Sequence, residues 1–223
     1  MGQAIGGVLS EAIGVAISPV PIIAMVLLLS STKGKSDAVA FLVAWLLGLA
    51  VVGTIVLLVA SPDGSDSGGR PAWVGWLLLG LGLLVLFFAF RQWRHRPKGD
   101  ESPPMPKWME AINDFSVGRA AGMGFILAAI NPKNTTLTLA AAAAIATSGV
   151  SSGEAFVSLA VFVVIGTLGL AVPLGISLFG GDRAADKLDN LHDWLAKNNP
   201  TIMTVLFLVI GAKLVGNGLQ TLL

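Results

Sequence analysis

The sequence predicts an all-α integral membrane protein whose six transmembrane helices form two inverted three-helix repeats. Its composition, 54% hydrophobic and 12% charged residues, suits a surface that faces lipid rather than water. Six apolar runs are long enough to cross a bilayer, and proline interrupts the first and the fourth of them near mid-membrane. Matching interruptions in two three-span halves are typical of inverted repeats.

The apolar runs predict helices because backbone groups in hydrocarbon must be paired within the segment. A helix needs about 20 residues to cross a hydrocarbon core of about 30 Å. We expect spans near residues 4–29, 38–60, 73–92, 120–146, 153–180 and 201–222. The first run lacks a basic flank and continues past any small-residue cleavage site, so we interpret it as a retained helix rather than a signal peptide.

The basic residues of the connecting loops predict the orientation, because such residues are retained on the cytoplasmic side. The connections after spans two and four hold only Arg70. The connections after spans one, three and five hold eleven, namely Lys33, Lys35, Arg91, Arg94, Arg96, Lys98, Lys107, Arg119, Arg183, Lys187 and Lys197. We therefore expect a multi-pass protein of the inner (cytoplasmic) membrane with both termini outside.

Two connecting segments have the pattern of short helices that lie in the membrane interface. The first is in the loop 91–119, where Trp108, Ile112 and Phe115 recur at helical spacing, and the second is 184–197. We expect both to be ordinary juxtamembrane helices. The predicted organisation is a first three-helix repeat over 1–90, a cytoplasmic loop over 91–119, and a second repeat over 120–223.

The two helix breaks have similar sequences, AISPVP at residues 16–21 and AINPKN at residues 129–134. Proline removes a backbone donor and clashes with the carbonyl four residues back. In lipid such a break is tolerated where other helices or a water-filled cavity supply partners. Because each unit has three spans, the second unit enters the membrane from the opposite side. A weaker match, GLAV at 48–51 and at 169–172, accompanies the breaks in spans two and five.

Three charged residues lie well inside the predicted spans: Glu11, Lys133 and Lys213. A charge at such depth costs at least about 2.5 kcal/mol unless it snorkels, pairs or meets water. Counting along the helices gives the three similar depths, so Glu11 could pair with either lysine. The alternative is a structural pair of Glu11 with one lysine, while the other lysine snorkels outward.

These residues predict a cavity between spans one, four and six, bounded by the two breaks. The half-helices that restart after the prolines direct their positive ends at it, and two lysines against one glutamate favour an anionic ligand. Glu11 is the proton-coupling candidate, as the one intramembrane carboxylate. The candidate substrate-binding residues are Ser18, Pro19, Asn131, Pro132, Lys133, Asn134, Lys213 and Asn217.

Several function classes are disfavoured. Cysteine is absent, so disulfides, thiolate metal sites and thiol relays are excluded. Divalent-metal export needs several carboxylate oxygens, and no nucleotide-binding loop is present. His95 and His192 lie in loops, and no Ser/His/Asp or Cys/His set occurs, so we expect no enzyme. We expect no cofactor, no metal and no nucleic-acid partner.

The sequence resembles a known family over essentially its whole length. The segments 18–21 and 131–134 are similar to the signatures of the LysE superfamily of small exporters, which have two inverted three-helix repeats. Within it, segments 194–199 and 210–219 resemble the GAP branch, the peptidoglycolipid and sulfolipid addressing proteins. The resemblance implies help in moving cell-envelope glycolipids across the cytoplasmic membrane. The first break departs from the second, with Ser18 and Val20 where Asn131 and Lys133 stand.

Three functions remain open at this point. The first is a transporter or transport-accessory protein for an amphiphilic, anionic cell-envelope glycolipid. The second is an exporter of a small solute such as an amino acid. The third is a non-transporting membrane scaffold that holds lipid-synthesis or export machinery through the loop 91–119. The bilayer and a lipid substrate are the expected partners, and a homodimer or a larger lipid-export machinery is compatible with each function.

Overall fold

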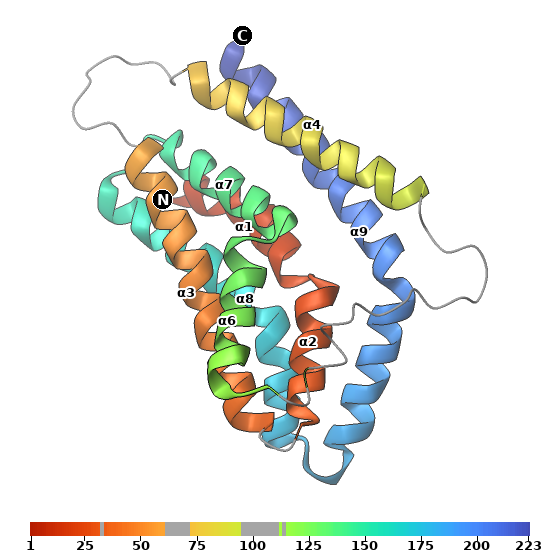
Figure 1. Cartoon of the computed structure of the whole chain (residues 1–223). Coiled ribbons are helices and arrows are strands. Elements are labelled where there is room, and N and C mark those ends of the chain that lie inside the picture. Colours follow the sequence, from red (N-terminus) through yellow and green to blue (C-terminus); the bar gives the residue numbers. More distant parts are fainter. Residues whose placement is uncertain (32–33, 61–71, 95–111, 113–114) are drawn as a thin grey trace.

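The fold is given by a computed structural model that describes residues 1–31, 34–60, 72–94, 112 and 115–223. Within these ranges the ordered elements are helices and no strand occurs. The helices, in chain order (Figure 1), are α1 (Gly2–Ala16), α2 (Pro19–Leu29), α3 (Gly34–Ala60), α4 (Ala72–Arg94), α6 (Val117–Ala129), α7 (Pro132–Ala146), α8 (Ser152–Phe179) and α9 (Ala184–Leu222). A short 3-10 helix, η2 (Gly181–Arg183), precedes α9.

Four of the described helices, α3, α4, α8 and α9, are individually long and apolar enough to cross a membrane. The pair α1 and α2 makes a fifth candidate span with a bend of 50°. The remaining predicted span, 120–146, is divided between α6 and α7, and the 13 residues of α6 are too few to cross alone. The prediction of an all-helical, multi-pass membrane protein is therefore confirmed, with four or five candidate spans.

Both predicted breaks are present, and proline begins the second half-helix in each. Ser18 precedes Pro19 with an extended backbone (φ −95°, ψ 103°), and Asn131 precedes Pro132 in the same way (φ −61°, ψ 120°). The residue before proline is driven to extended conformations, and proline suits the first helical position because that position needs no N–H. The local sequence is sufficient to place both breaks.

The predicted interfacial helix over 184–197 is not a separate element, which corrects the sequence interpretation. It is the first part of α9, which runs without interruption through Pro200. Proline removes one N–H and bends a helix without necessarily ending it, and Figure 1 shows α9 changing direction along its length. The Thr204 hydroxyl donates to the Pro200 carbonyl at 2.8 Å. Most of the helix predicted in the loop 91–119 lies outside the described residues.

The helices α4 and α9 form a closely packed pair, hereafter the α4/α9 pair (Figure 1). Glycine permits the contact: a Cβ added to Gly82 would lie 2.7 Å from the nitrogen of Val215, and one added to Gly218 would lie 2.7 Å from the nitrogen of Leu79. Such close backbone approach is how membrane helices associate, since lipid provides no hydrophobic drive. The pair lies against a bundle formed by the other helices.

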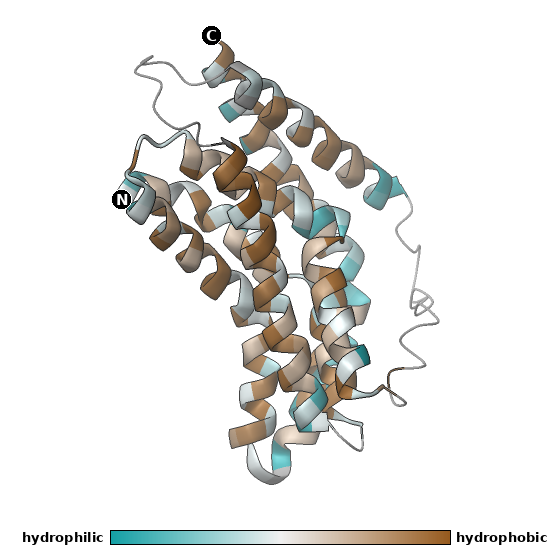
Figure 2. Cartoon of the chain, turned by 60° about the vertical axis from the view of Figure 1, so that its left-hand side comes forward, coloured by the Kyte–Doolittle hydropathy of each residue, from teal (hydrophilic) through white to brown (hydrophobic). Residues whose placement is uncertain are grey.

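The outer surface of the described helices is largely apolar, as a bilayer requires. Large apolar side chains are widely exposed, including Leu58 (66%) and Val59 (72%) on α3 and Phe90 (61%) on α4. In Figure 2 the long helices are mainly brown, the colour of hydrophobic residues. Exposed apolar surface on this scale is the mark of a protein that meets lipid or a partner rather than water.

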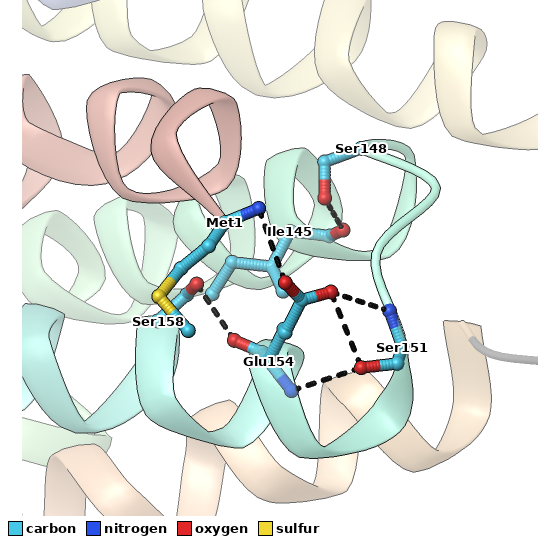
Figure 3. Close-up of polar contacts among 6 residues, drawn as sticks. All are labelled: Met1, Ile145, Ser148, Ser151, Glu154 and Ser158. Atoms are coloured by element: carbon cyan, nitrogen blue, oxygen red, sulfur yellow. Dashed lines mark hydrogen bonds and ion pairs between the residues drawn. The ribbon is translucent and has the colours of Figure 1, made fainter.

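The two termini lie at the same end of the molecule (Figure 1). There the amino group of Met1 lies 3.5 Å from Oε1 of Glu154. Glu154 also completes a capping box at the start of α8, because its carboxylate accepts the Ser151 N–H while the Ser151 hydroxyl accepts the Glu154 N–H (Figure 3). These contacts connect the start of α1 to the start of α8.

Candidate functional site

A cavity of about 490 Å³ lies where the two helix breaks face the α4/α9 pair. The breaks supply one side of it and the α4/α9 pair supplies the other. Its lining residues are Ser18, Pro19, Val20, Pro21, Phe88, Arg91, Gln92, Asn131, Pro132, Lys133, Asn134, Asn199, Met203 and Phe207. A volume of this size is typical of a small-molecule site.

Polar side chains join the two breaks across the floor of this cavity. The Lys133 ammonium donates to the Ser18 hydroxyl at 2.5 Å. That hydroxyl lies 2.6 Å from the Val15 carbonyl and 3.1 Å from Oδ1 of Asn134, and its single proton can serve one of the two. Asn134 donates in turn to the Leu127 carbonyl at 2.9 Å. Side chains thus replace backbone hydrogen bonds that the breaks remove.

Two basic side chains line the cavity, and no carboxylate lines it with them. Lys133 is only 7% exposed, and no carboxylate of the described residues forms an ion pair with it. Arg91 lines the opposite side, and the lining includes neither aspartate nor glutamate. A buried cation without a counter-charge is costly. The site therefore favours a ligand that brings a negative charge.

Backbone groups add to the attraction for an anion. The first-turn N–H groups of a helix have no intrahelical partner and carry the positive end of the helix dipole. Pro19 and Pro132 have no N–H, and the Lys133 N–H donates to Oδ1 of Asn131 at 3.1 Å. Two first-turn N–H groups therefore remain as donors without an intrahelical partner. They belong to Val20 at the start of α2 and Asn134 at the start of α7, and both residues line the cavity.

The side of the cavity formed by the α4/α9 pair has an apolar part next to the polar Arg91 and Gln92. Phe88 and Phe207 contact each other with ring centroids 6.1 Å apart, and Met203 continues this wall. Asn199 is the polar exception on α9, since its Oδ1 is buried and accepts no hydrogen bond from the described residues. The cavity thus combines a cationic floor with an aromatic and aliphatic wall, as an amphiphilic ligand requires.

Six of the predicted substrate-binding residues meet at this cavity: Ser18, Pro19, Asn131, Pro132, Lys133 and Asn134. Sequence reasoning missed the contribution of the α4/α9 pair. The sequence analysis used Arg91 only as an orientation signal, although it lies at the end of an apolar span. Asn199 belongs to the segment 194–199, whose family resemblance was a usable signal.

Lys213 and Asn217 do not line the cavity. The Lys213 ammonium instead pairs with Glu11, at 3.0 Å from Oε1 and 2.9 Å from Oε2, and also donates to Ser10 Oγ and, at 2.9 Å, to the Gly7 carbonyl. Glu11 is 1% exposed and Lys213 is 30% exposed. Of the two possible pairings, the structure forms Glu11 with Lys213, so the positive charge of the cavity comes from Lys133 and Arg91.

The ion pair of Glu11 and Lys213 couples α1 to α9. A double-mutant cycle can measure this coupling free energy. Lys213→Met leaves the Glu11 carboxylate buried without its cation, which is expected to destabilise the protein by about 3 kcal/mol. Adding Glu11→Gln should restore much of this loss, because the amide carries no charge. Chemical unfolding in detergent gives the coupling free energy. Additive effects of the two changes would show that the pair does not link the helices.

A family model described as Sap, sulfolipid-1-addressing protein, matches residues 8–220, which is nearly the whole chain and includes both breaks and the α4/α9 pair. No curated protein and no solved structure matches the chain significantly.

Proposed function

The chain belongs to the sulfolipid-1-addressing protein family, and from this premise we propose that it moves, or helps to move, an anionic amphiphilic cell-envelope glycolipid across the cytoplasmic membrane. Family membership and the apolar helices indicate a membrane-associated role in lipid transport. The cavity between the breaks supports the finer proposal. Its cations suit a charged headgroup, and its apolar wall suits the adjoining hydrocarbon.

The observation that carries the proposal is the buried Lys133 without a carboxylate partner, with Arg91 on the opposite side of the same cavity. In the proposed complex, Lys133 contacts the anionic group of the lipid from the floor of the cavity and Arg91 from the opposite side. The N–H groups of Val20 and Asn134 supply uncharged donors at two helix starts. The acyl chains leave along the wall of Phe88, Met203 and Phe207 toward the bilayer.

Cross-packing of the two halves supports an inverted repeat of six spans. Gly169 on α8 packs against the backbone of Ala16, at the end of α1. In the corresponding place, Gly48 on α3 packs against α6, where an added Cβ would lie 2.8 Å from Cβ of Ala128 and 3.6 Å from that of Ala129. The GLAV segment of each half thus supports the break of the other half. Such symmetry suits alternating access around a central site.

The position of basic residues supports termini outside the cell. Lys35, Arg119 and Lys187 lie in the first turns of α3, α6 and α9. These helix starts are at the end of the molecule opposite both termini (Figure 1). By the positive-inside rule that end is cytoplasmic.

Energy for transport is proposed to come from a proton gradient through Glu11. Protonation of this carboxylate would remove the charge that holds Lys213, and so would loosen α9 from α1. The α4/α9 pair, which forms one side of the cavity, would then be free to move. The sequence contains no nucleotide-binding loop that would supply energy instead.

The two other functions differ from this proposal in what they require of the cavity. A solute exporter needs a polar enclosure, whereas Phe88, Met203 and Phe207 give part of this cavity an aromatic and aliphatic lining. A scaffold needs no cavity charge at all, so it would tolerate neutralisation of Lys133.

Lipid analysis of a strain that lacks this chain tests the proposal. We expect the surface-exposed pool of one anionic glycolipid to fall and its internal pool to rise, because synthesis continues without export. Re-expression of the chain should restore the distribution. An unchanged surface profile in the deletion strain would contradict lipid transport, and a fall in both pools would instead favour a role in synthesis.

A further inference from the structure

A second concave feature lies on the outer face of the bundle, in the groove between α3 and α6. The two helices pack side by side and start at the same end of the molecule (Figure 1). The groove has a volume of about 710 Å³ and shares no residue with the cavity. Its lining residues are Lys35, Ser36, Val39, Ala40, Val43, Ala44, Leu47, Val117 and Ala121.

The groove is a shallow apolar strip that is long enough for one hydrocarbon chain. Ala40 and Ala44 of α3 are half-buried small residues, and they are flanked by the more exposed Val39 (46%), Val43 (49%) and Leu47 (56%). From Ser36 to Leu47 the helix rises about 17 Å, roughly half the thickness of a hydrocarbon core. The apolar part therefore matches one leaflet in length.

The polar part of the groove is confined to one end, and its charge is positive. Lys35 and Ser36 lie in the first turn of α3, and Val117 begins α6 at the same level. The lysine is joined there by the positive dipole ends of two helices. Asp37 follows in the same turn of α3, but it is 1% exposed and does not line the groove. The groove end is thus complementary to an anion.

We propose that this groove binds an anionic phospholipid of the bilayer as a structural ligand, with its phosphate at Lys35 and one acyl chain along α3 and α6. A cation at a helix end above an apolar intramembrane groove is the arrangement that recognises acidic headgroups. The site is separate from the transport cavity. It stabilises the contact between α3 and α6, which carries the second break.

The test uses the full-length protein in nanodiscs of phosphatidylcholine that contain phosphatidylglycerol, with native mass spectrometry of the retained lipids. Lys35→Gln should lower retained phosphatidylglycerol about fivefold, because one lysine at the surface contributes that much to binding an acidic headgroup. Ala44→Phe should fill the groove and lower all lipid retained there. Matched controls are Lys187→Gln, the same charge change at the same end, and Leu58→Phe, on α3 outside the groove.

Repeating the measurement in the Lys133→Met variant separates lipid bound in the groove from lipid bound in the cavity. Lys35→Gln should lower retained phosphatidylglycerol by the same factor with and without Lys133. Equal retention in the Lys35→Gln variant and the wild type would overturn the proposal, as would equal losses in Lys35→Gln and Lys187→Gln. If Ala44→Phe changes the oligomeric state and leaves lipid retention unaltered, the groove is an interface between copies and the proposal fails.

Discussion

Replacing Lys133 with methionine is expected to reduce lipid export at least tenfold while membrane insertion remains normal. Methionine is apolar and similar in length to lysine, so the substitution removes the basic group without leaving an empty space. A hydrogen bond to a charged group contributes about 1.5–3 kcal/mol, which corresponds to roughly tenfold to hundredfold in affinity. Membrane insertion should not fall, because the substitution removes a basic group from the membrane interior. Surface lipid pools and the amount of protein in the membrane are the two measurements.

The control for this prediction is Lys187→Met, which removes a cation from the exposed first turn of α9. It changes the net charge of the protein equally but does not touch the cavity. Arg91→Met should reproduce a large part of the Lys133 defect, because Arg91 lines the same cavity. Normal export by the Lys133 and Arg91 variants would exclude the cavity as an anion site.

The breaks could be predicted from sequence because proline acts locally. Pro19 and Pro132 fix the conformation of the residue before them and remove their own N–H, whatever surrounds the chain. Pro200 shows the limit of this reasoning. The same residue type lies inside α9 without ending it, since the outcome for a helix depends on packing on both sides of the proline.

The sequence limited the possible partners of Glu11 to Lys133 and Lys213 but could not decide between them. Counting residues gives depth along a helix, and it placed Glu11, Lys133 and Lys213 at similar levels. It does not give the direction in which each side chain points, which tertiary packing decides. Lys213 faces α1, whereas Lys133 faces Ser18 at the break. For the same reason Arg91 could not be assigned to the cavity from its position in the sequence.

Replacing Gly169 with alanine is expected to be more damaging than almost any other single-methyl addition in the chain. The added Cβ would overlap the carbonyl oxygen of Ala16. A flexible side chain could rotate away, but this oxygen belongs to the backbone at the end of α1. The cost of overpacking is typically about 1–3 kcal/mol and rises where backbone must shift. We expect a lower midpoint of thermal unfolding in detergent and a loss of surface lipid, because Ser18, which lines the cavity, lies two residues after Ala16.

Gly175 provides the matched control on the same helix. A Cβ there has nothing within 4 Å, so Gly175→Ala should be neutral or stabilising by up to about 1 kcal/mol through helix propensity. Gly48→Ala should fall between the two, since its nearest contact is the Ala128 side chain at 2.8 Å, with the Phe125 carbonyl at 3.2 Å. If Gly169→Ala and Gly175→Ala behave alike, α8 does not support the first break. If Gly48→Ala and Gly169→Ala both impair export while Gly175→Ala does not, each half of the protein positions the break of the other, as an inverted repeat requires.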